Sequence, residues 1–272
     1  MNSVSPQGLP QFDRQAVASR GCQSSCKKLR ELLIALPYRL SLLQMTTVSP
    51  ALLPAIEVET GPHPTHTVLW LHGLGADGGD FVPIVNELEL PSAMHIRFLF
   101  PHAPMRSVSI NRGMVMRAWY DYDMVDLNLG LQENMASLNE SQQAIEALIA
   151  REKQRGIQPE RIVLAGFSQG GALALQAGLR YPEKLAGILV LSAYLPAPRT
   201  LASDANRANL TTSIFMAHGN SDMVIPMIVA AASKQQLAES GYAVEWHEYR
   251  MAHTVCREEL ADIGKWLKQI LI

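Results

Sequence analysis

The sequence Gly166-Phe167-Ser168-Gln169-Gly170 places a serine in a G-x-S-x-G pattern. The apolar run 161–165 before it predicts a strand, and the small residues of 171–177 after it predict a helix. A serine on so tight a turn between a strand and a helix exposes its side-chain oxygen at the end of the sheet, where the oxygen can act as a nucleophile. A glycine-rich loop that merely contains a serine is the alternative, and the flanking elements favour a nucleophilic Ser168.

A serine nucleophile requires a general base and a carboxylate that orients the base. Asp222 lies in a loop after the expected strand 213–217, and His253 lies in a short loop after the expected strand 243–249. On the fold that uses such a serine turn, the chain order is serine, then acid, then histidine. The sequence therefore predicts a triad of Ser168, His253 and Asp222.

Other residues could supply the acid or the base, but each is less well placed. His247 and Glu248 lie inside an expected strand, and no strand precedes Asp204. Cys256 comes three residues after the proposed base, and a small, buried apolar side chain is the simpler interpretation of it. These residues remain the alternatives to the predicted triad.

Acyl transfer also needs two N–H donors for the oxyanion that forms on the substrate. The apolar run 67–71 predicts an early strand, and a glycine-rich turn at 72–80 follows it. A turn in this place supplies one backbone N–H of the oxyanion hole, and the residue after the nucleophile supplies the other. We assign these donors to Leu74 and Gln169. Phosphate binding is the alternative for a glycine-rich loop, but neither a P-loop nor a dinucleotide fingerprint is present.

These motifs together resemble the acyl-protein thioesterase / carboxylesterase–phospholipase family of α/β-hydrolases. The resemblance covers about Pro50 to the C-terminus and rests on 71–77, 100–104, 111–113 with Met116, 119–121, 166–172, 218–226 and 251–256. It implies hydrolysis of carboxylic esters or thioesters through an acyl-enzyme, without a cofactor or metal. Short-chain acyl esters, lysophospholipids and acylated cysteines all fit it as substrates, and a homodimer is plausible for the family. Small departures at Arg112, Arg250 and Thr254 bear on substrate preference, because none is a triad position.

The segment 102–130 is expected to be long and irregular, and it is rich in methionine and aromatic residues. One interpretation is an apolar wall for an acyl chain, since methionine adapts well to binding surfaces. On that interpretation Met116 and Trp119 contact the substrate, together with Leu195. The other interpretation is a loop that packs over the core, with 119–121 as its anchor.

Strand-like and helix-like runs alternate along most of the chain, which predicts a mainly parallel central sheet with helices on both faces, the α/β-hydrolase fold. The expected strands are 67–72, 95–100, 161–166, 186–191, 213–217 and 243–249. The expected helices are 80–89, 131–154, 169–180, 226–240 and 255–271. With 272 residues, 48% of them hydrophobic, the chain can bury one sizeable core.

The first 45 residues differ in charge from the rest, with six basic residues against two acidic ones. We expect 1–45 to be a poorly ordered extension and 46–272 to be the hydrolase domain; a docking helix and a weak targeting segment are the alternatives. Three cysteines in the whole chain suit a reducing, cytoplasmic compartment. The net charge of −2 gives no reason to expect nucleic acid as a partner, and no apolar run is long enough for stable membrane insertion.

A non-catalytic binding protein on the same fold is the main competing hypothesis. Such a descendant need not keep all three triad residues in order, and this chain keeps them. A peptidase is the other alternative, but the interval 223–252 leaves little space for the lid or propeller domain that selects peptides. The sequence therefore favours an esterase or thioesterase.

Overall fold

The computed structural model describes residues 52–123 and 132–271, which belong to one compact unit, Ser49–Ile272. The predicted extension 1–45 lies outside the described residues. Within the described ranges, no helix is both long enough and apolar enough to cross a bilayer.

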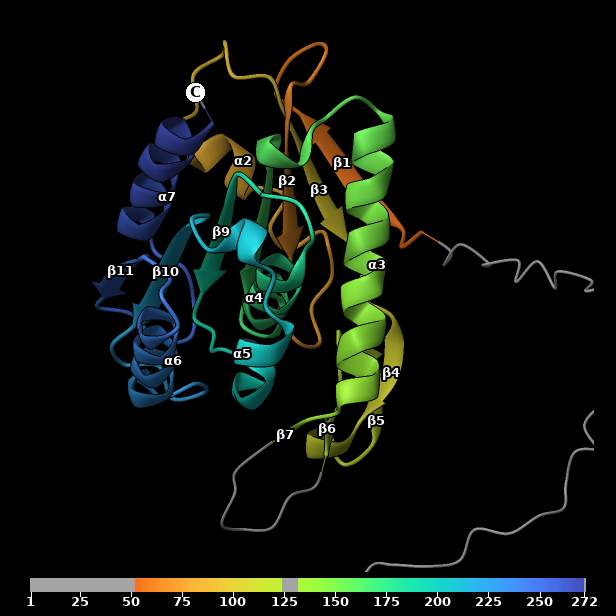
Figure 1. Cartoon of the computed structure of the whole chain (residues 1–272), viewed down its shortest axis with the longest axis vertical. Coiled ribbons are helices and arrows are strands. Elements are labelled where there is room, and N and C mark those ends of the chain that lie inside the picture. The colour runs from red at the N-terminus through yellow and green to blue at the C-terminus, as the bar shows by residue number, and fades with distance from the viewer. Residues whose placement is uncertain (1–51, 124–131, 272) are drawn as a thin grey trace, which may run out of the picture. The chain divides into compact units, whose positions relative to one another are not determined.

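A seven-stranded, mostly parallel sheet forms the centre of this unit, in the order β1-β3-β2-β8-β9-β10-β11 (Figure 1). Only β1 runs antiparallel to its neighbour, β3. The strands are β1 (Ala55–Glu59), β2 (His66–Leu71), β3 (Ile96–Pro101), β8 (Ile162–Phe167), β9 (Gly187–Leu191), β10 (Ser213–Gly219) and β11 (Val244–Tyr249). Because parallel strands all end at one edge of the sheet, the loops after β2, β8, β10 and β11 meet there.

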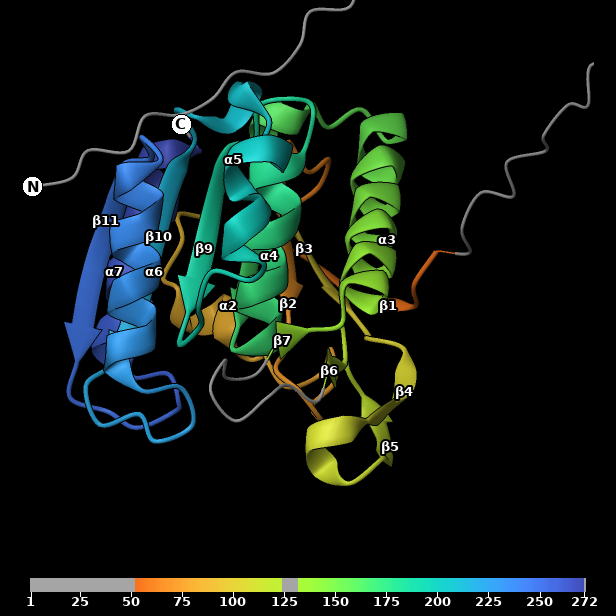
Figure 2. The same cartoon turned by 60° about the horizontal axis from the view of Figure 1, so that its bottom comes forward.

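Helices cover both faces of the sheet, as Figure 2 shows from a second side. They are α2 (Ile84–Glu87), α3 (Met135–Gln154), α4 (Gln169–Arg180), α5 (Leu201–Asp204), α6 (Met227–Glu239) and α7 (Arg257–Ile270). One buried cluster joins α3, α4 and α6 to side chains such as Leu164, and a second joins α2 and α7 to side chains such as Val163. Neighbouring residues of β8 thus point to opposite layers, which confirms the predicted α/β-hydrolase architecture.

The expected helix 80–89 is wrong in extent, because helix α2 spans only Ile84–Glu87. Residues 80–83 form turns, and the helix begins directly after Pro83, which has no backbone N–H to donate. Helix α3 begins at Met135, where the side chain of Asn134 accepts a hydrogen bond from the backbone N–H of Ser137.

The expectation of an irregular segment at 102–130 is wrong for most of its described part. Strands β4 (Met105–Val108) and β5 (Met114–Arg117) form an antiparallel hairpin. The turn between them contains the short 3-10 helix η1 (Ser109–Asn111) and two successive residues with positive φ, Arg112 at 57° and Gly113 at 76°. A further pair of short strands, β6 (Tyr122–Asp123) and β7 (Gln132–Glu133), completes this part of the molecule.

Three other 3-10 helices lie in the connections between the main elements. They are η2 (Pro159–Arg161), η3 (Pro198–Thr200) and η4 (Arg207–Asn209). Helix η3 and the helix α5 that follows it form part of the connection between β9 and β10, and their residues Thr200 and Asp204 lie beside Arg180 at the C-terminal end of α4.

Candidate active site

Ser168 lies on the turn between β8 and α4 with φ of 55° and ψ of −122°, a conformation that L-residues rarely adopt. The two flanking glycines make this turn sterically feasible. A β-carbon at Gly166 would lie 2.3 Å from the carbonyl oxygen of Gly170, and one at Gly170 would lie 2.2 Å from the carbonyl oxygen of Leu71. The strained turn brings the start of α4 against the end of β2, and it directs Ser168 into a cavity.

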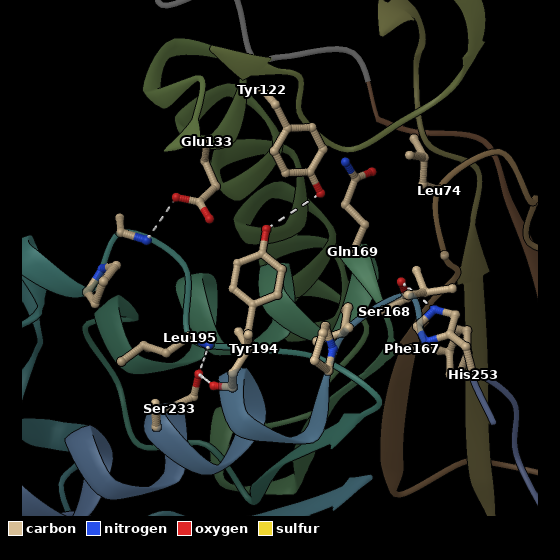
Figure 3. A pocket seen from close by; sticks show the side chains of 18 of the residues that line it. Leu74, Tyr122, Glu133, Phe167, Ser168, Gln169, Tyr194, Leu195, Ser233 and His253 are labelled. Atoms are coloured by element: carbon tan, nitrogen blue, oxygen red, sulfur yellow. Dashed lines mark hydrogen bonds between the residues drawn. The ribbon is translucent and has the colours of Figure 1, made fainter. Parts of the chain in front are cut away.

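The structure brings the three predicted triad residues together, and Figure 3 shows two of them, Ser168 and His253. Nε2 of His253 lies 2.9 Å from Oγ of Ser168, and Nδ1 of His253 lies 2.7 Å from Oδ2 of Asp222. The ring of Phe167 packs on the imidazole at 4.7 Å between centroids. The imidazole therefore bridges a hydroxyl and a carboxylate at hydrogen-bonding distance, an arrangement that lets it accept the serine proton.

The carboxylate of Asp222 is buried, and both of its oxygens are engaged. Oδ2 contacts His253, while Oδ1 accepts hydrogen bonds from the backbone N–H groups of Val224 and Ile225 at 2.8 and 2.9 Å. Burial opposes ionisation, but the hydrogen bonds from His253 and from the two backbone groups outweigh it and lower the pKa of Asp222 below its usual value. These contacts therefore favour the anionic form of Asp222, which accepts the hydrogen bond from Nδ1 of His253.

The loops that carry the acid and the base are in direct backbone contact. A β-carbon at Gly219 would lie 2.4 Å from the carbonyl oxygens of both Met251 and Ala252. Backbone N–H groups of Asn220 and Ser221 donate to carbonyl oxygens of Tyr249 and Met251 at 2.9 and 3.1 Å. Because the two strands β10 and β11 pair up to Gly219, the sheet itself fixes the Asp222–His253 pair.

The two predicted oxyanion donors border the same cavity as Ser168. Among the described residues, neither the N–H of Leu74 nor that of Gln169 donates to another protein group. The Gln169 N–H belongs to the first turn of α4, where backbone donors have no partner inside the helix. Both N–H groups are thus available to a negatively charged oxygen.

His72 holds the loop that carries Leu74. Its Nδ1 donates to the carbonyl oxygen of Gly73 at 2.7 Å, so its Nε2 is the acceptor for the N–H of Ala103 at 3.0 Å. Burial lowers the pKa of this histidine, more than the neighbouring carbonyl and carboxylates raise it. A neutral His72 is the form that this pair of hydrogen bonds requires.

The side chain of Gln169 and the indole of Trp119 connect the two halves of the predicted oxyanion hole. Gln169 accepts from the backbone N–H of Trp119 at 2.8 Å and donates to the carbonyl oxygen of Tyr120 at 2.7 Å. In turn, Nε1 of Trp119 donates to the carbonyl oxygen of His72 at 2.8 Å. Sequence reasoning missed this network, because its members are far apart along the chain.

A family model described as Phospholipase/Carboxylesterase matches residues 53–271, which include every element of this site. The chain belongs to this family. It is 35% identical to acyl-protein thioesterase 1 of Yarrowia lipolytica over 220 residues, which cover 79% of this chain and 96% of the relative. It is 37% identical to acyl-protein thioesterase 1 of Gibberella zeae over 234 residues, which cover 82% and 96%.

Solved structures lead to the same family. Arabidopsis thaliana SOBER1 is similar with a TM-score of 0.71 and 33% identity, over 76% of this chain and 99% of that one. Zea mays acyl-protein thioesterase 2 is similar with a TM-score of 0.70 and 27% identity, over 80% and 99%. The resemblance inferred from the sequence is thereby confirmed, and the protein is a hydrolase of the carboxylesterase and thioesterase type.

The hydrolase has a cavity of about 1460 Å³ beside Ser168, larger than most small-molecule sites. Leu195 lines it, as predicted for a substrate contact. Trp119 and Met116 are not among the described residues that line it, so their expected place in an apolar wall is wrong. The Trp119 side chain is fully buried and anchors its loop, and the sulfur of Met116 accepts a hydrogen bond from Asn111.

The alternative acids and bases lie away from Ser168. His247 stacks on Phe215 and contacts Glu245, and Asp204 lies beside Arg180. Burial raises the pKa of the Cys256 thiol, which disfavours the thiolate that a cysteine nucleophile needs. In the part of the chain that the structure describes, no cluster of side chains could hold a metal ion.

Three cavity residues were not anticipated from the sequence: Tyr122, Glu133 and Tyr194. All three line the cavity, and Figure 3 shows Tyr194 next to Leu195, with its hydroxyl directed toward Tyr122. Tyr122 lies in β6 and Tyr194 in the loop after β9, 72 positions away, and their hydroxyl groups approach each other. No local sequence pattern predicts a contact between two tyrosines so far apart along the chain.

Proposed function

We propose that this protein is a serine hydrolase that cleaves carboxylic esters or thioesters through an acyl-enzyme, with Ser168 as nucleophile, His253 as base and Asp222 as the acid that orients it. The observation that carries the proposal is the continuous contact from Ser168 Oγ through His253 to Asp222, at 2.9 and 2.7 Å. Membership of the family supports the reaction class, and the geometry supports the assignment of roles.

In the first half-reaction, Oγ of Ser168 attacks the carbonyl carbon of the substrate while Nε2 of His253 accepts the serine proton. The carbonyl oxygen becomes an oxyanion facing the N–H groups of Leu74 and Gln169, which are free to donate. Asp222 stabilises the imidazolium through Nδ1. The bond to the leaving group then breaks, and His253 transfers its proton to the departing alcohol or thiol.

In the second half-reaction, water replaces the leaving group. His253 takes a proton from the water, the resulting hydroxide attacks the acyl carbon, and a second oxyanion faces the same two N–H groups. When the acyl–oxygen bond breaks, His253 returns the proton to Ser168 and the carboxylic acid leaves. His253 accepts and returns every proton in this cycle. Ser168 and His253 therefore end in the protonation states in which they began.

The proposed substrates are short-chain acyl esters, lysophospholipids and acylated cysteines. The relatives called acyl-protein thioesterase favour an acylated protein as one of them. The large cavity beside Ser168 supports acyl groups longer than acetyl. A reducing compartment, as the cysteine usage suggests, is consistent with thioesters of cysteine.

Replacement of the nucleophile tests the proposal. Ser168→Ala should lower kcat by a factor on the order of 10⁴ or more, because the oxyanion hole and substrate binding alone remain. A fluorophosphonate probe should label the native protein at Ser168 and leave Ser168→Ala unlabelled. Ser221→Ala, which changes an exposed serine in the Asp222 loop, is the matched control. Native turnover by Ser168→Ala would overturn the assignment.

A further inference from the structure

The cavity has one wall that is too polar for a simple hydrocarbon chain. Tyr122, Tyr194 and Glu133 line it, the buried Tyr120 lies behind them, and we call these four residues the phenol wall. The hydroxyl oxygens of Tyr120 and Tyr194 lie 3.1 Å apart, and those of Tyr194 and Tyr122 lie 3.5 Å apart. Apolar residues such as Leu195 and Val229 line the cavity elsewhere, so polar and apolar surfaces face the same space.

The three hydroxyl groups form a directed chain. Tyr120 is fully buried, and its hydroxyl has Tyr194 as its partner among the described residues. If Tyr120 did not donate to Tyr194, its own hydrogen would be buried without an acceptor, which is costly. Tyr120 therefore donates to Tyr194, Tyr194 donates to Tyr122, and the hydroxyl hydrogen of Tyr122 has no acceptor among the described residues, so it can be donated to a group in the cavity.

The hydroxyl groups of Tyr120 and Tyr194 keep their protons over the whole working pH range. Burial first, and then the neighbouring phenols and Glu133, raise the pKa of Tyr120 and of Tyr194 well above the usual value. Each of these two hydroxyl groups therefore keeps the hydrogen that it donates. The direction of the chain is then the same throughout this pH range.

An acceptor of hydrogen bonds lies beside this donor. Glu133 pairs with Tyr122 across the short ladder of β6 and β7, and directly opposed residues project from the same face. One oxygen of Glu133 accepts the N–H of Ala197 at 3.3 Å, and the other accepts no hydrogen bond from the described residues, so it retains its acceptor capacity. A donor and a carboxylate acceptor thus border the same cavity, and a hydroxyl group is able both to accept and to donate a hydrogen bond.

The phenol wall lies on the acyl side of Ser168. The leaving group must depart toward His253, which protonates it, so the acyl chain extends away from His253. Figure 3 shows Tyr194, Tyr122 and Glu133 on the side of Ser168 opposite to His253. Whatever group meets the phenol wall is therefore carried by the acyl part of the substrate.

We propose that the phenol wall selects acyl groups that carry a hydroxyl, which accepts from Tyr122 and donates to Glu133. This inference rests on the proposed function, since it names the substrate class of the same site. An unsubstituted chain would cover a polar donor and a carboxylate without replacing their hydrogen bonds to water, and that mismatch is what discriminates against it.

Matched pairs of acyl thioesters test the inference, each pair with and without a hydroxyl, and with the hydroxyl moved along the chain. For at least one position, kcat/KM should favour the hydroxylated member by about tenfold or more. Tyr122→Phe and Glu133→Gln should each bring that ratio close to one, and the ratio is internal to each variant. Tyr181→Phe, which removes a phenol hydrogen bond outside the cavity, should keep the native ratio.

The outcomes separate this inference from the proposed function. Hydrolysis of both members with no preference at any hydroxyl position would overturn the hydroxyl inference and leave the hydrolase intact. An ammonium-bearing acyl group that is preferred over the hydroxylated one, with the preference lost in Glu133→Gln, would assign the wall to a cation and also overturn it. No hydrolysis of any pair by the native protein would count against the proposed function itself.

Discussion

The oxyanion loop, 72–80, and the rim of α6, 223–229, both border Ser168, but they differ in how they are held and exposed. The loop is fixed by hydrogen bonds to distant segments, such as Gly75 N–H to the carbonyl oxygen of Arg117 and Gly78 N–H to Nδ1 of His102. The rim is held locally, where the N–H groups of Val224 and Ile225 donate to Asp222, and it exposes apolar side chains, with Met223 90% and Ile228 77% exposed. The loop proposed to face the oxyanion is thus held by long-range contacts, whereas apolar side chains of the rim are exposed to solvent.

We expect this difference between the loop and the rim to separate effects on kcat from effects on acyl-chain preference. An oxyanion donor that is misplaced by a fraction of an ångström loses much of its value, so the loop needs redundant support. An apolar contact is non-directional and tolerates displacement. Changes on the loop side should therefore lower kcat, and changes on the rim should alter KM and chain-length preference.

Asp222→Asn should give the largest effect in this comparison. The amide keeps the shape of the side chain but favours the wrong tautomer of His253, so kcat should fall by about 10³–10⁴. Since hydrogen bonds lower the pKa of Asp222, its contribution to stability is present above the usual carboxyl range and is lost as the pH falls through the lowered pKa. Steady-state kinetics and acid unfolding measure both consequences.

Asp204→Asn is the control for the acid, because Asp204 lies near Arg180 and far from His253. Its rate should match that of the native protein. An unchanged rate in Asp222→Asn, or a large loss in Asp204→Asn, would show that the orienting acid has been chosen wrongly.

Trp119→Phe should give an intermediate effect. It removes the hydrogen bond to the carbonyl oxygen of His72 but keeps an aromatic ring in the core, so we expect kcat to fall about tenfold with little change in acyl-length preference. Trp266→Phe is the matched control, since its Nε1 donates to Ser213 below the other face of the sheet. If Trp119→Phe shifted the acyl-length profile and left kcat alone, Trp119 would be a substrate contact after all.

Ile228→Ser should give the smallest effect. It removes an exposed apolar side chain from the mouth of the cavity, so KM for long acyl substrates should rise by a few-fold while kcat stays near the native value. Val115→Ser changes a comparably exposed residue on the β4–β5 hairpin and should alter neither constant. A fall in kcat for Ile228→Ser would mean that the rim takes part in the reaction.

Much of the fold could be predicted from the sequence, because strands such as β8 and β10 are continuous apolar runs and their helices follow closely. Strand β1 was missed, since Ala55–Glu59 is short and takes its place only through antiparallel pairing with β3. The hairpin of β4 and β5 was missed for a related reason. Its strands are four residues each and partly exposed, and tertiary contacts rather than hydrophobic periodicity define them.

The candidate site, like the fold, could be predicted from the sequence only in part. Ser168, Asp222 and His253 could be proposed because each lies directly after a strand, and strand ends converge. Trp119 was assigned to the substrate because a large aromatic residue in a loop fits a cavity wall and a core equally well in sequence. Tyr194 and Glu133 were missed because their roles depend on approach across the cavity, which no spacing along the chain encodes.

The close approach at Gly219 has a mechanical consequence. Because the backbones of the acid loop and the base loop touch there and share two hydrogen bonds, Asp222 and His253 belong to one rigid piece. Thermal fluctuations can carry that piece toward or away from Ser168, but they cannot easily separate its members. For the proposed triad, we therefore expect His253 and Asp222 to separate from Ser168 together, so that one distance rather than two has to be restored before the next reaction.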